Sequence, residues 1–236
     1  MIHYHGTPIT PRAKLYELAG KSFCVSFAHP RDADVAVQIG QQVMFDNGAF
    51  SAYTQGKIYE SRAFMDWVEQ YLSPPHWAVI PDCIGEDVKK NMDLLKTWRF
   101  PPHVSAPVWH LDLPIPYLLR LCDDWPRVCF GSSGEYWEVG SAKWAGRVNE
   151  AFNAITQSFG TLPWIHMMRG LDQSGRDWPF ASADSCNVAV NHSEKPDIRA
   201  FADRIDSVQC PLTWVPKPIQ TPLFDATLAN HLGNMS

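Results

Sequence analysis

The feature that most constrains the fold is a regular alternation of two kinds of segment along the sequence. Short apolar, β-favouring runs alternate with segments of helical spacing, and a polar turn follows most of the runs. This alternation is typical of a parallel sheet surrounded by helices. The expected strands are 23–27, 43–45, 77–80, 106–110, 127–130, 164–168 and 180–183, with an eighth near 212–214. The sequence therefore predicts an α/β fold, and within that class a compact (β/α)8 TIM-like barrel.

Helical spacing fills the gaps between these runs. The helix expected over 61–72, for example, can be capped by Ser61 and places Phe64 and Val68 on one face. The other expected helices are 30–38, 87–98, 115–122, 144–158 and 197–205. A chain of 236 residues can bury one large core, so we expect residues 1–236 to form a single domain. The proline-rich segment 216–236 is expected to form an extended strap over the barrel.

Composition excludes several classes of protein. Hydrophobic residues make up 45% of the chain and charged residues 19%, which excludes a disordered chain, and the apolar runs are too short to span a bilayer. The start lacks a basic region followed by an apolar one, so we expect a cytoplasmic protein. The six cysteines form no Cys-x-x-Cys pair, which indicates neither a disulfide framework nor a zinc site. With a net charge of -5, nucleic acid would have to bind through a local patch.

Polar residues collect at the ends of the expected strands. Val43-Met44-Phe45 runs directly into Asp46 and then into Asn47-Gly48, where the backbone must turn. In a parallel barrel the carboxyl ends of the strands face one mouth, so a carboxylate placed there can reach a ligand. Asp82, His110, Arg169 and Asp184 stand in similar positions. Each acid also has a simpler explanation, because Asp is common in turns and as a helix cap.

These strand ends resemble the motifs of the tRNA-guanine transglycosylases. Asp46-Asn47-Gly48-Ala49-Phe50 resembles the Asp-Ser-Gly-Gly-Phe/Tyr motif of that family, and Pro81-Asp82-Cys83 resembles its base-reading turn. Gly131-Ser132-Ser133-Gly134-Glu135 is similar to its Gly-rich loop, and Ala183-Asp184-Ser185 to the segment of its late nucleophilic Asp. The motifs follow the order of the family across about residues 40–190.

The resemblance implies a βα-barrel that breaks the bond between a base and its sugar and installs a deazaguanine. Relatives of the family act on DNA. Carried over to this chain, it implies that Asp184 is the nucleophile and Asp46 the acid/base. Asp82 and His110 would read the edge of the base. The other substrate contacts that we expect from these motifs and strand ends are Asn47, Phe50, Ser132, Ser133, Gly134, Glu135, Met168 and Arg169, with Phe50 and Met168 stacking on the base.

The chemistry of the bond fits this assignment. Its cleavage develops positive charge on the sugar, which one carboxylate can stabilise or trap while a second acid protonates the leaving base. The acid needs a raised pKa, which the neighbouring Phe45 and Phe50 could give Asp46 by excluding water. The base must also leave its stack, at a cost of a few kcal/mol that an aromatic pocket offsets.

The chain departs from the family in ways that shape the expected substrate. The Cys-x-Cys-x-x-Cys zinc site is absent, so we expect neither a metal nor a cofactor, and DNA rather than tRNA as the partner. Asn47 and Ala49 stand where the family has Ser and Gly, which indicates a pocket for a different base. If a free deazaguanine enters, the reaction is an exchange; if water enters instead, the protein is a glycosylase.

Two other functions are compatible with the sequence. His3-x-His5, together with His110, His166 and Asp184, superficially resembles the metal set of amidohydrolase barrels. Only Met1 and Ile2 precede the pair, however, so rather than a strand we expect a turn near the mouth at residues 5–8, where it could contact substrate. The other alternative is a non-catalytic barrel that binds nucleic acid or a partner through its ten tryptophans.

Overall fold

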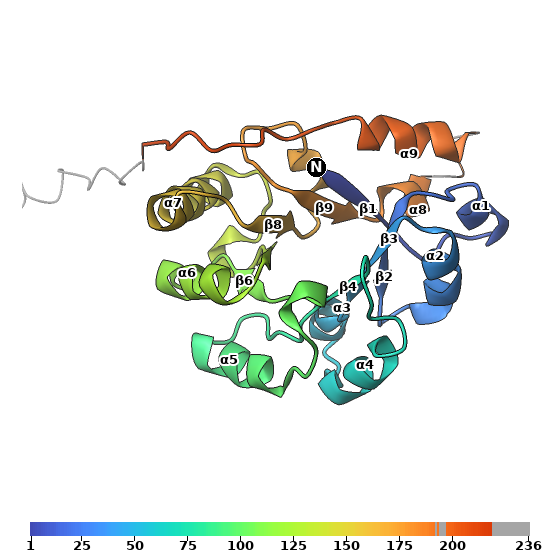
Figure 1. Cartoon of the computed structure of the whole chain (residues 1–236), viewed down its shortest axis with the longest axis horizontal. Coiled ribbons are helices and arrows are strands. Elements are labelled where there is room, and N and C mark those ends of the chain that lie inside the picture. The colour runs from blue at the N-terminus through green and yellow to red at the C-terminus, as the bar shows by residue number, and fades with distance from the viewer. Residues whose placement is uncertain (192, 194–196, 219–236) are drawn as a thin grey trace, which may run out of the picture.

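The computed structural model describes residues 1–191, 193 and 197–218, which form a parallel sheet with helices around it (Figure 1). Every strand pairing is parallel. The strands are β1 (Ile2–Gly6), β2 (Ser22–Ser26), β3 (Gln42–Asp46), β4 (Trp77–Val79), β5 (Ser105–Ala106), β6 (Val108–His110), β7 (Arg127–Gly131), β8 (Trp164–Met167) and β9 (Ser182–Ser185). The helices are α1 (Ala13–Tyr16), α2 (Ala33–Ile39), α3 (Ala49–Thr54), α4 (Ser61–Val68), α5 (Val88–Thr97), α6 (Ile115–Asp124), α7 (Ala142–Phe159), α8 (Asn187–Asn191) and α9 (Ile198–Asp206).

The sheet curls into a nearly closed barrel. Its strand order is β5-β4-β3-β2-β1-β9-β8-β7-β6, so β5 and β6 stand at the two ends of the order. In the chain these two strands are separated only by Pro107. A proline has no N–H to give to a ladder, but its carbonyl still accepts a hydrogen bond of 2.8 Å from the backbone N–H of Cys129 on β7. The expected α/β class is confirmed, with a nine-strand, barrel-like parallel sheet.

The structure corrects the sequence prediction at both ends of the chain. Residues 2–6 were not expected to form a strand, yet they form β1 in the middle of the sheet, between β2 and β9. The strand expected near 212–214 is absent, because residues 211–218 contain neither helix nor strand. This segment instead lies on α7, where Asn153 donates to the carbonyl of Lys217 at 2.7 Å. Of the strap expected over 216–236, residues 219–236 lie outside the described part of the chain.

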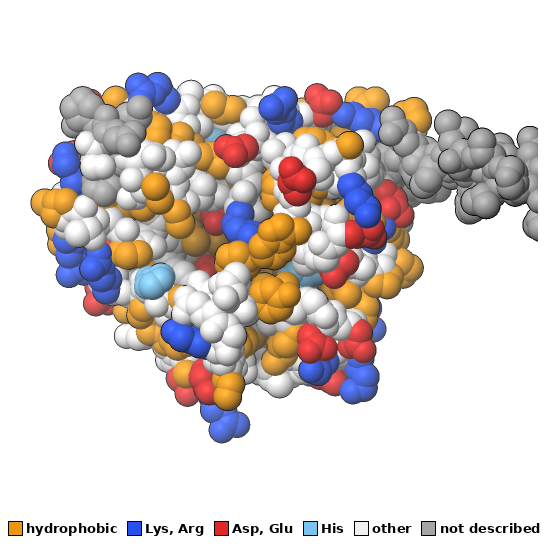
Figure 2. All heavy atoms as spheres, turned by 180° about the vertical axis from the view of Figure 1, so that it is seen from behind, with side chains coloured by type: hydrophobic (Ala, Val, Ile, Leu, Met, Phe, Trp, Pro, Cys, Tyr) orange, Lys and Arg blue, Asp and Glu red, His pale blue; other side chains and the backbone are white. Residues whose placement is uncertain are grey.

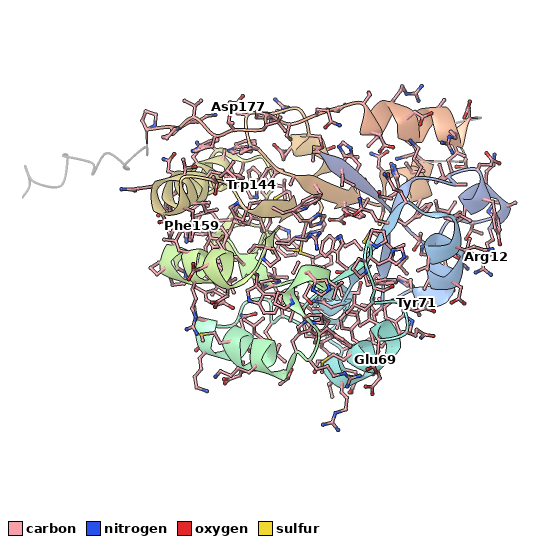
Figure 3. The ribbon with its side chains drawn as sticks, viewed as in Figure 1. Arg12, Glu69, Tyr71, Trp144, Phe159 and Asp177 are labelled. Atoms are coloured by element: carbon pink, nitrogen blue, oxygen red, sulfur yellow. The ribbon has the colours of Figure 1, made fainter. Side chains whose placement is uncertain are left out.

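Side chains of alternate parity face the inside and the outside of the barrel. The inner cluster consists of Tyr4, Cys24, Met44, Trp77, Val79, Ala106, Val108 and Cys129. The outward side chains form two further clusters against the surrounding helices. Trp144 on α7, labelled in Figure 3, is buried in one of them and donates to the Ser132 hydroxyl at 2.9 Å. None of the helices in the described residues is long and apolar enough to cross a membrane.

Candidate active site at the mouth of the barrel

Asp46 and Asp184 both belong to the inner side of the sheet. Asp46 is the last residue of β3. It lies two residues after Met44, a member of the inner cluster, so its side chain faces the same side of the sheet. Asp184 lies on β9, two residues after Ser182, and therefore faces the same side of the sheet as Ser182. The Ser182 hydroxyl contacts a histidine inside the barrel. Both aspartates are partly accessible to solvent. The strand ends therefore present two carboxylates to the same interior.

The register of the strands brings these carboxylates to a similar height. Asp184 pairs with Tyr4, Tyr4 with Ser22, and Ser22 with Gln42, so β3 must run four residues further to reach Asp46. In a barrel of eight strands with a shear of 8, the register drifts by about one residue per strand. The three steps from β9 through β1 and β2 to β3 thus account for most of the four-residue offset between Asp184 and Asp46. The charge of Asp184 accordingly contributes to the pKa of Asp46.

Asp46 holds its proton unusually well. Burial is the main cause that raises the pKa of Asp46 to about 6, and the charges of Asp184 and Asp82 raise it further. Hydrogen bonds from Ser26 and from the backbone N–H of Gly48, the latter 3.2 Å from Oδ2, act in the opposite direction. The expected raised pKa is confirmed, but Phe45 does not cause it. Phe45 faces outward and stacks on Tyr71 with a centroid distance of 5.3 Å.

Within the described residues, Asp184 is held through one of its two oxygens. Its Oδ1 accepts a hydrogen bond of 2.8 Å from the backbone N–H of Arg169 and lies 3.2 Å from Nε2 of His166. No hydrogen bond from the described part of the chain reaches Oδ2. The Asp184 side chain is 15% exposed, while that of His166 is fully buried beneath it. Oδ2 is therefore the atom available to a ligand.

Asp82, three residues after the end of β4, and His110, the last residue of β6, form a buried pair. Nε2 of His110 lies 2.8 Å from Oδ2 of Asp82, and Asn47 donates to Oδ1 of Asp82 at 2.7 Å. Gly131 leaves room for the imidazole, since a Cβ there would lie 2.9 Å from its Nδ1. The structure thus joins three residues that the sequence analysis placed in the site: Asn47, Asp82 and His110.

Two aromatic rings meet above the mouth. Phe50 on α3 stacks on Trp137 with centroids 5.6 Å apart and planes at 27°. Phe50 follows β3 and Trp137 follows β7. When β5 and β6 are taken as neighbours, the strand order becomes a ring in which β3 and β7 stand on opposite sides. The contact between the two aromatic rings therefore spans the mouth. The guanidinium of Arg169 lies 4.1 Å from the Phe50 centroid and 4.9 Å from that of Trp137. Figure 2 shows a Lys or Arg side chain beside hydrophobic side chains near the centre of one face.

Met168 and the 131–135 loop, which we expect to contact substrate, make the following contacts within the protein. Met168 packs against the inner cluster of the barrel. The hydroxyl of Ser132 accepts from Trp144, and that of Ser133 donates to Asp112 at 2.6 Å. Gly134 and Glu135 are exposed, and Glu135 pairs with Lys143. The Ser132 carbonyl accepts a hydrogen bond of 3.2 Å from the guanidinium of Arg169 at the mouth.

The histidines of the amidohydrolase-like pattern do not converge. His3 and His5 lie on β1 as that pattern requires, but between them Tyr4 faces the interior and they face outward. His5 lies 3.0 Å from Oδ1 of Asp206 on α9, and His3 lies 3.0 Å from the Ser174 hydroxyl. His166 points inward. Among the described residues no group of three or more His, Cys, Asp or Glu could hold a metal ion.

Two residues of the mouth were not recognised from the sequence in their present roles. His166 was considered only as a metal ligand, although its parity on the 164–168 strand, two positions before Met168, already indicated an inward side chain. Trp137 lies in a loop without periodicity, so no pattern placed it. Comparison with known proteins identifies no relative, because no family model, curated protein or solved structure matches the chain.

Proposed function

We propose that this protein cleaves the N-glycosidic bond of a nucleotide in nucleic acid, as a glycosylase or as a transglycosylase that exchanges the base. The observation that carries the proposal is the pairing of two unlike carboxylates in one mouth: Asp46 with a pKa raised to about 6, and Asp184 with Oδ1 held by donors and Oδ2 free. Two acids in different environments are what glycosidic cleavage needs. We also propose that β5 and β6 are halves of one strand, which gives the eight strands of a (β/α)8 barrel.

In the proposed reaction the two aspartates act on opposite ends of the breaking bond. Oδ2 of Asp184 stabilises the positive charge that develops on the sugar carbon, or forms a covalent bond to it. Asp46 gives its proton to the leaving base, and as a carboxylate it then activates the incoming water or base. A pKa near 6 suits both steps, because the acid and its conjugate base are both populated close to neutral pH.

The base would be bound between the two halves of the mouth. Asp82, fixed by Asn47 and His110, offers carboxylate oxygens to the N–H groups of a base edge. Phe50 and Trp137 supply aromatic faces, and Met168 supplies a thioether from the barrel side. An extruded base gains stacking from such walls, which offsets the cost of leaving its own stack. Arg169 supplies a cation near the entrance for a phosphate.

DNA is the proposed polymer, and the partner base for an exchange is a free deazaguanine. The resemblance of the strand-end motifs to the transglycosylase family supports both, and the absence of that family's zinc-binding cysteines argues against tRNA. With a net charge of -5, the contact with the polymer is confined to the mouth and its immediate surroundings.

The test compares the wild-type protein with Asp184→Asn and with the control Asp123→Asn, an exposed residue on α6. Each is incubated with unmodified DNA, modified phage DNA and tRNA, with and without labelled deazaguanine. We expect released base, with abasic sites or incorporated label, from the wild type and the control, and a loss of at least about 10³-fold in Asp184→Asn. Binding without any base release would instead indicate a non-catalytic nucleic-acid-binding protein and overturn the proposal.

A further inference from the structure

His166 lies in the centre of the barrel, directly below the mouth. Its side chain is fully buried, and its ring packs edge-on against Tyr4 and Trp77, with centroids 5.8 Å and 5.4 Å away. A buried polar ring is costly unless its nitrogens are hydrogen-bonded. Both nitrogens of His166 have a partner: Nδ1 lies 2.9 Å from the hydroxyl oxygen of Ser182, and Nε2 lies 3.2 Å from Oδ1 of Asp184.

The direction of these hydrogen bonds can be worked out from the chemistry of the partners. Trp164 has a ring N–H that can only donate, and it donates to the Ser182 hydroxyl oxygen at 2.9 Å. An ionised Asp184 can only accept, so the neutral ring must carry its proton on Nε2. Nδ1 is then an acceptor, and the Ser182 hydroxyl hydrogen is the donor that faces it. The result is a series of hydrogen bonds with one donor direction, in which Trp164 donates to Ser182, Ser182 to His166 and His166 to Asp184.

The other groups near the ring do not compete for this proton. Burial raises the pKa of Tyr4 to about 12 and raises the pKa of the Cys24 and Cys129 thiols well above their usual range, so these groups stay neutral. Arg127, beside Trp77, is a cation and cannot accept. The charge of Asp184, at the upper end of this chain of hydrogen bonds, helps to raise the pKa of Asp46 and of the Cys186 thiol and opposes the lowering of the Arg169 pKa by burial.

We propose that His166, as the Nε2–H tautomer, is the positioning residue that fixes Asp184 with Oδ2 directed into the mouth. Two donors on Oδ1, the imidazole from below and the Arg169 backbone from the side, restrain the carboxylate more firmly than one. Arg169 has a φ of 56°, which places its N–H at Asp184 through a backbone conformation that is uncommon outside glycine. Hydrogen-bond partners that orient a metal ligand are worth about 10- to 100-fold in activity, and we expect an effect of that size from His166 on Asp184. The catalytic consequence rests on the proposed function, whereas the tautomer does not.

The tautomer can be tested without a substrate. Long-range 1H–15N correlation spectra of protein labelled at the histidine nitrogens distinguish the two neutral forms and the charged ring. We expect the His166 signals to be those of the Nε2–H form, because Nε2 faces the Asp184 carboxylate and Nδ1 faces the Ser182 hydroxyl. A His166 signal in the Nδ1–H form, or in the doubly protonated form, would overturn the proposal.

A kinetic test separates positioning from folding. His166→Gln keeps an N–H that can reach Asp184, while His166→Leu removes it at similar bulk. We expect His166→Leu to lower kcat by about 10- to 100-fold with little change in KM, and His166→Gln to recover most of that loss. If His166→Leu does not fold, the Gln variant and the tautomer spectra still decide.

The two proposals fail in different ways. Wild-type kcat in a folded His166→Leu variant, beside an inactive Asp184→Asn variant, would remove the role of His166 and leave the proposed function in place. No base release from the wild-type protein would remove the function, while the spectra would still show whether His166 holds Asp184.

Discussion

Asn47 donates a hydrogen bond of 2.7 Å to Oδ1 of Asp82, across 35 positions of the chain, and so joins the ends of β3 and β4. The same amide donates to the Ile80 carbonyl at 2.8 Å, and its oxygen accepts from the backbone N–H of Ala49, also at 2.8 Å. Asn47 is 1% exposed, so all these groups are withdrawn from water. One side chain thus closes the turn after β3 and orients the carboxylate proposed to read the base.

Replacing Asn47 by Ala is expected to lower stability as well as function. The change leaves a buried carbonyl, a buried N–H and a carboxylate oxygen without their partner, and each unsatisfied group costs about 1–3 kcal/mol. We expect a loss of roughly 3 kcal/mol in the free energy of unfolding, measured by urea denaturation. Gln55→Ala, at an exposed position just after α3, is the control and should change little. Equal stability of the two variants would contradict the structural role of Asn47.

Asp46→Asn is expected to become more stable relative to the wild type as the pH rises. The folded-state pKa of Asp46 is about 6, whereas the ordinary pKa of an Asp side chain is 3.8, so between these values the folded protein binds more protons than the unfolded chain. Wild-type stability therefore falls as the pH rises through this window, and the neutral Asn avoids the loss. The gain amounts to roughly 3 kcal/mol at most by pH 7, since one pKa unit corresponds to 1.36 kcal/mol.

The measurement is a series of urea titrations of both proteins between pH 4 and 8. Asp123→Asn, which changes an exposed carboxyl on α6, should follow the wild type throughout. If the curves for Asp46→Asn and wild type ran parallel over the whole range, the raised pKa of Asp46 would be wrong.

His3 should make the opposite contribution to the pH dependence. Burial is the main cause that lowers the pKa of His3 to about 4, although Asp206 acts against it. The unfolded chain therefore binds more protons than the folded protein between about pH 4 and 6.5, and stability is lost as the pH falls through this range. His3→Gln keeps a polar partner for Ser174 without a titrating ring. We expect its stability relative to the wild type to improve by up to roughly 3 kcal/mol from pH 7 to pH 4.5, measured by urea denaturation; an unchanged difference would contradict this.

Periodicity predicted most of the fold and failed where a partner lies far away in the sequence. The buried strands β3, β4, β7 and β8 are apolar enough to be recognised locally. β1 was expected to be a turn because only Met1 and Ile2 precede its two histidines, and what makes His5 acceptable in a buried strand is Asp206 on α9, 201 positions later. Pairing of this kind cannot be read from a window of neighbouring residues.

The site shows the same limit at the level of single side chains. Asp46, Asp82 and Asp184 were found because a polar residue at the end of an apolar run marks the mouth of a barrel. Phe45 was given a role beside Asp46 that its parity excludes, since adjacent residues of a strand face opposite sides. The contact of Trp137 with Phe50 depends on the paths of two loops, which the sequence alone does not determine.

Arg169→Gly and Arg169→Ala should differ although both remove the same side chain. Both lose the contacts of the guanidinium with Phe50 and with the Ser132 carbonyl. Only glycine adopts a φ of 56° without strain, and the left-handed conformation costs other residues about 1 kcal/mol. We expect the Gly variant to be more stable than the Ala variant by about that amount in urea denaturation. Higher stability of the Ala variant would contradict the backbone conformation at the mouth.

Trp137→Ala is expected to weaken the binding of single-stranded DNA. Trp137 is 44% exposed although it stacks on Phe50, so an aromatic surface remains open at the mouth. Base stacking on such a surface is worth about 1–3 kcal/mol, which corresponds to a Kd at least about fivefold higher without the ring. Binding is measured by fluorescence anisotropy in an Asp184→Asn background, so that turnover does not interfere. Trp137→Phe should retain most of the affinity, and Tyr16→Ala, which removes a 51% exposed ring on the peripheral helix α1 (Figure 1), should leave it unchanged. Because stacking tolerates any base, the loss should be similar for oligonucleotides of different sequence; equal affinity of the Trp137→Ala and Tyr16→Ala variants would show that the nucleic acid does not enter by this route.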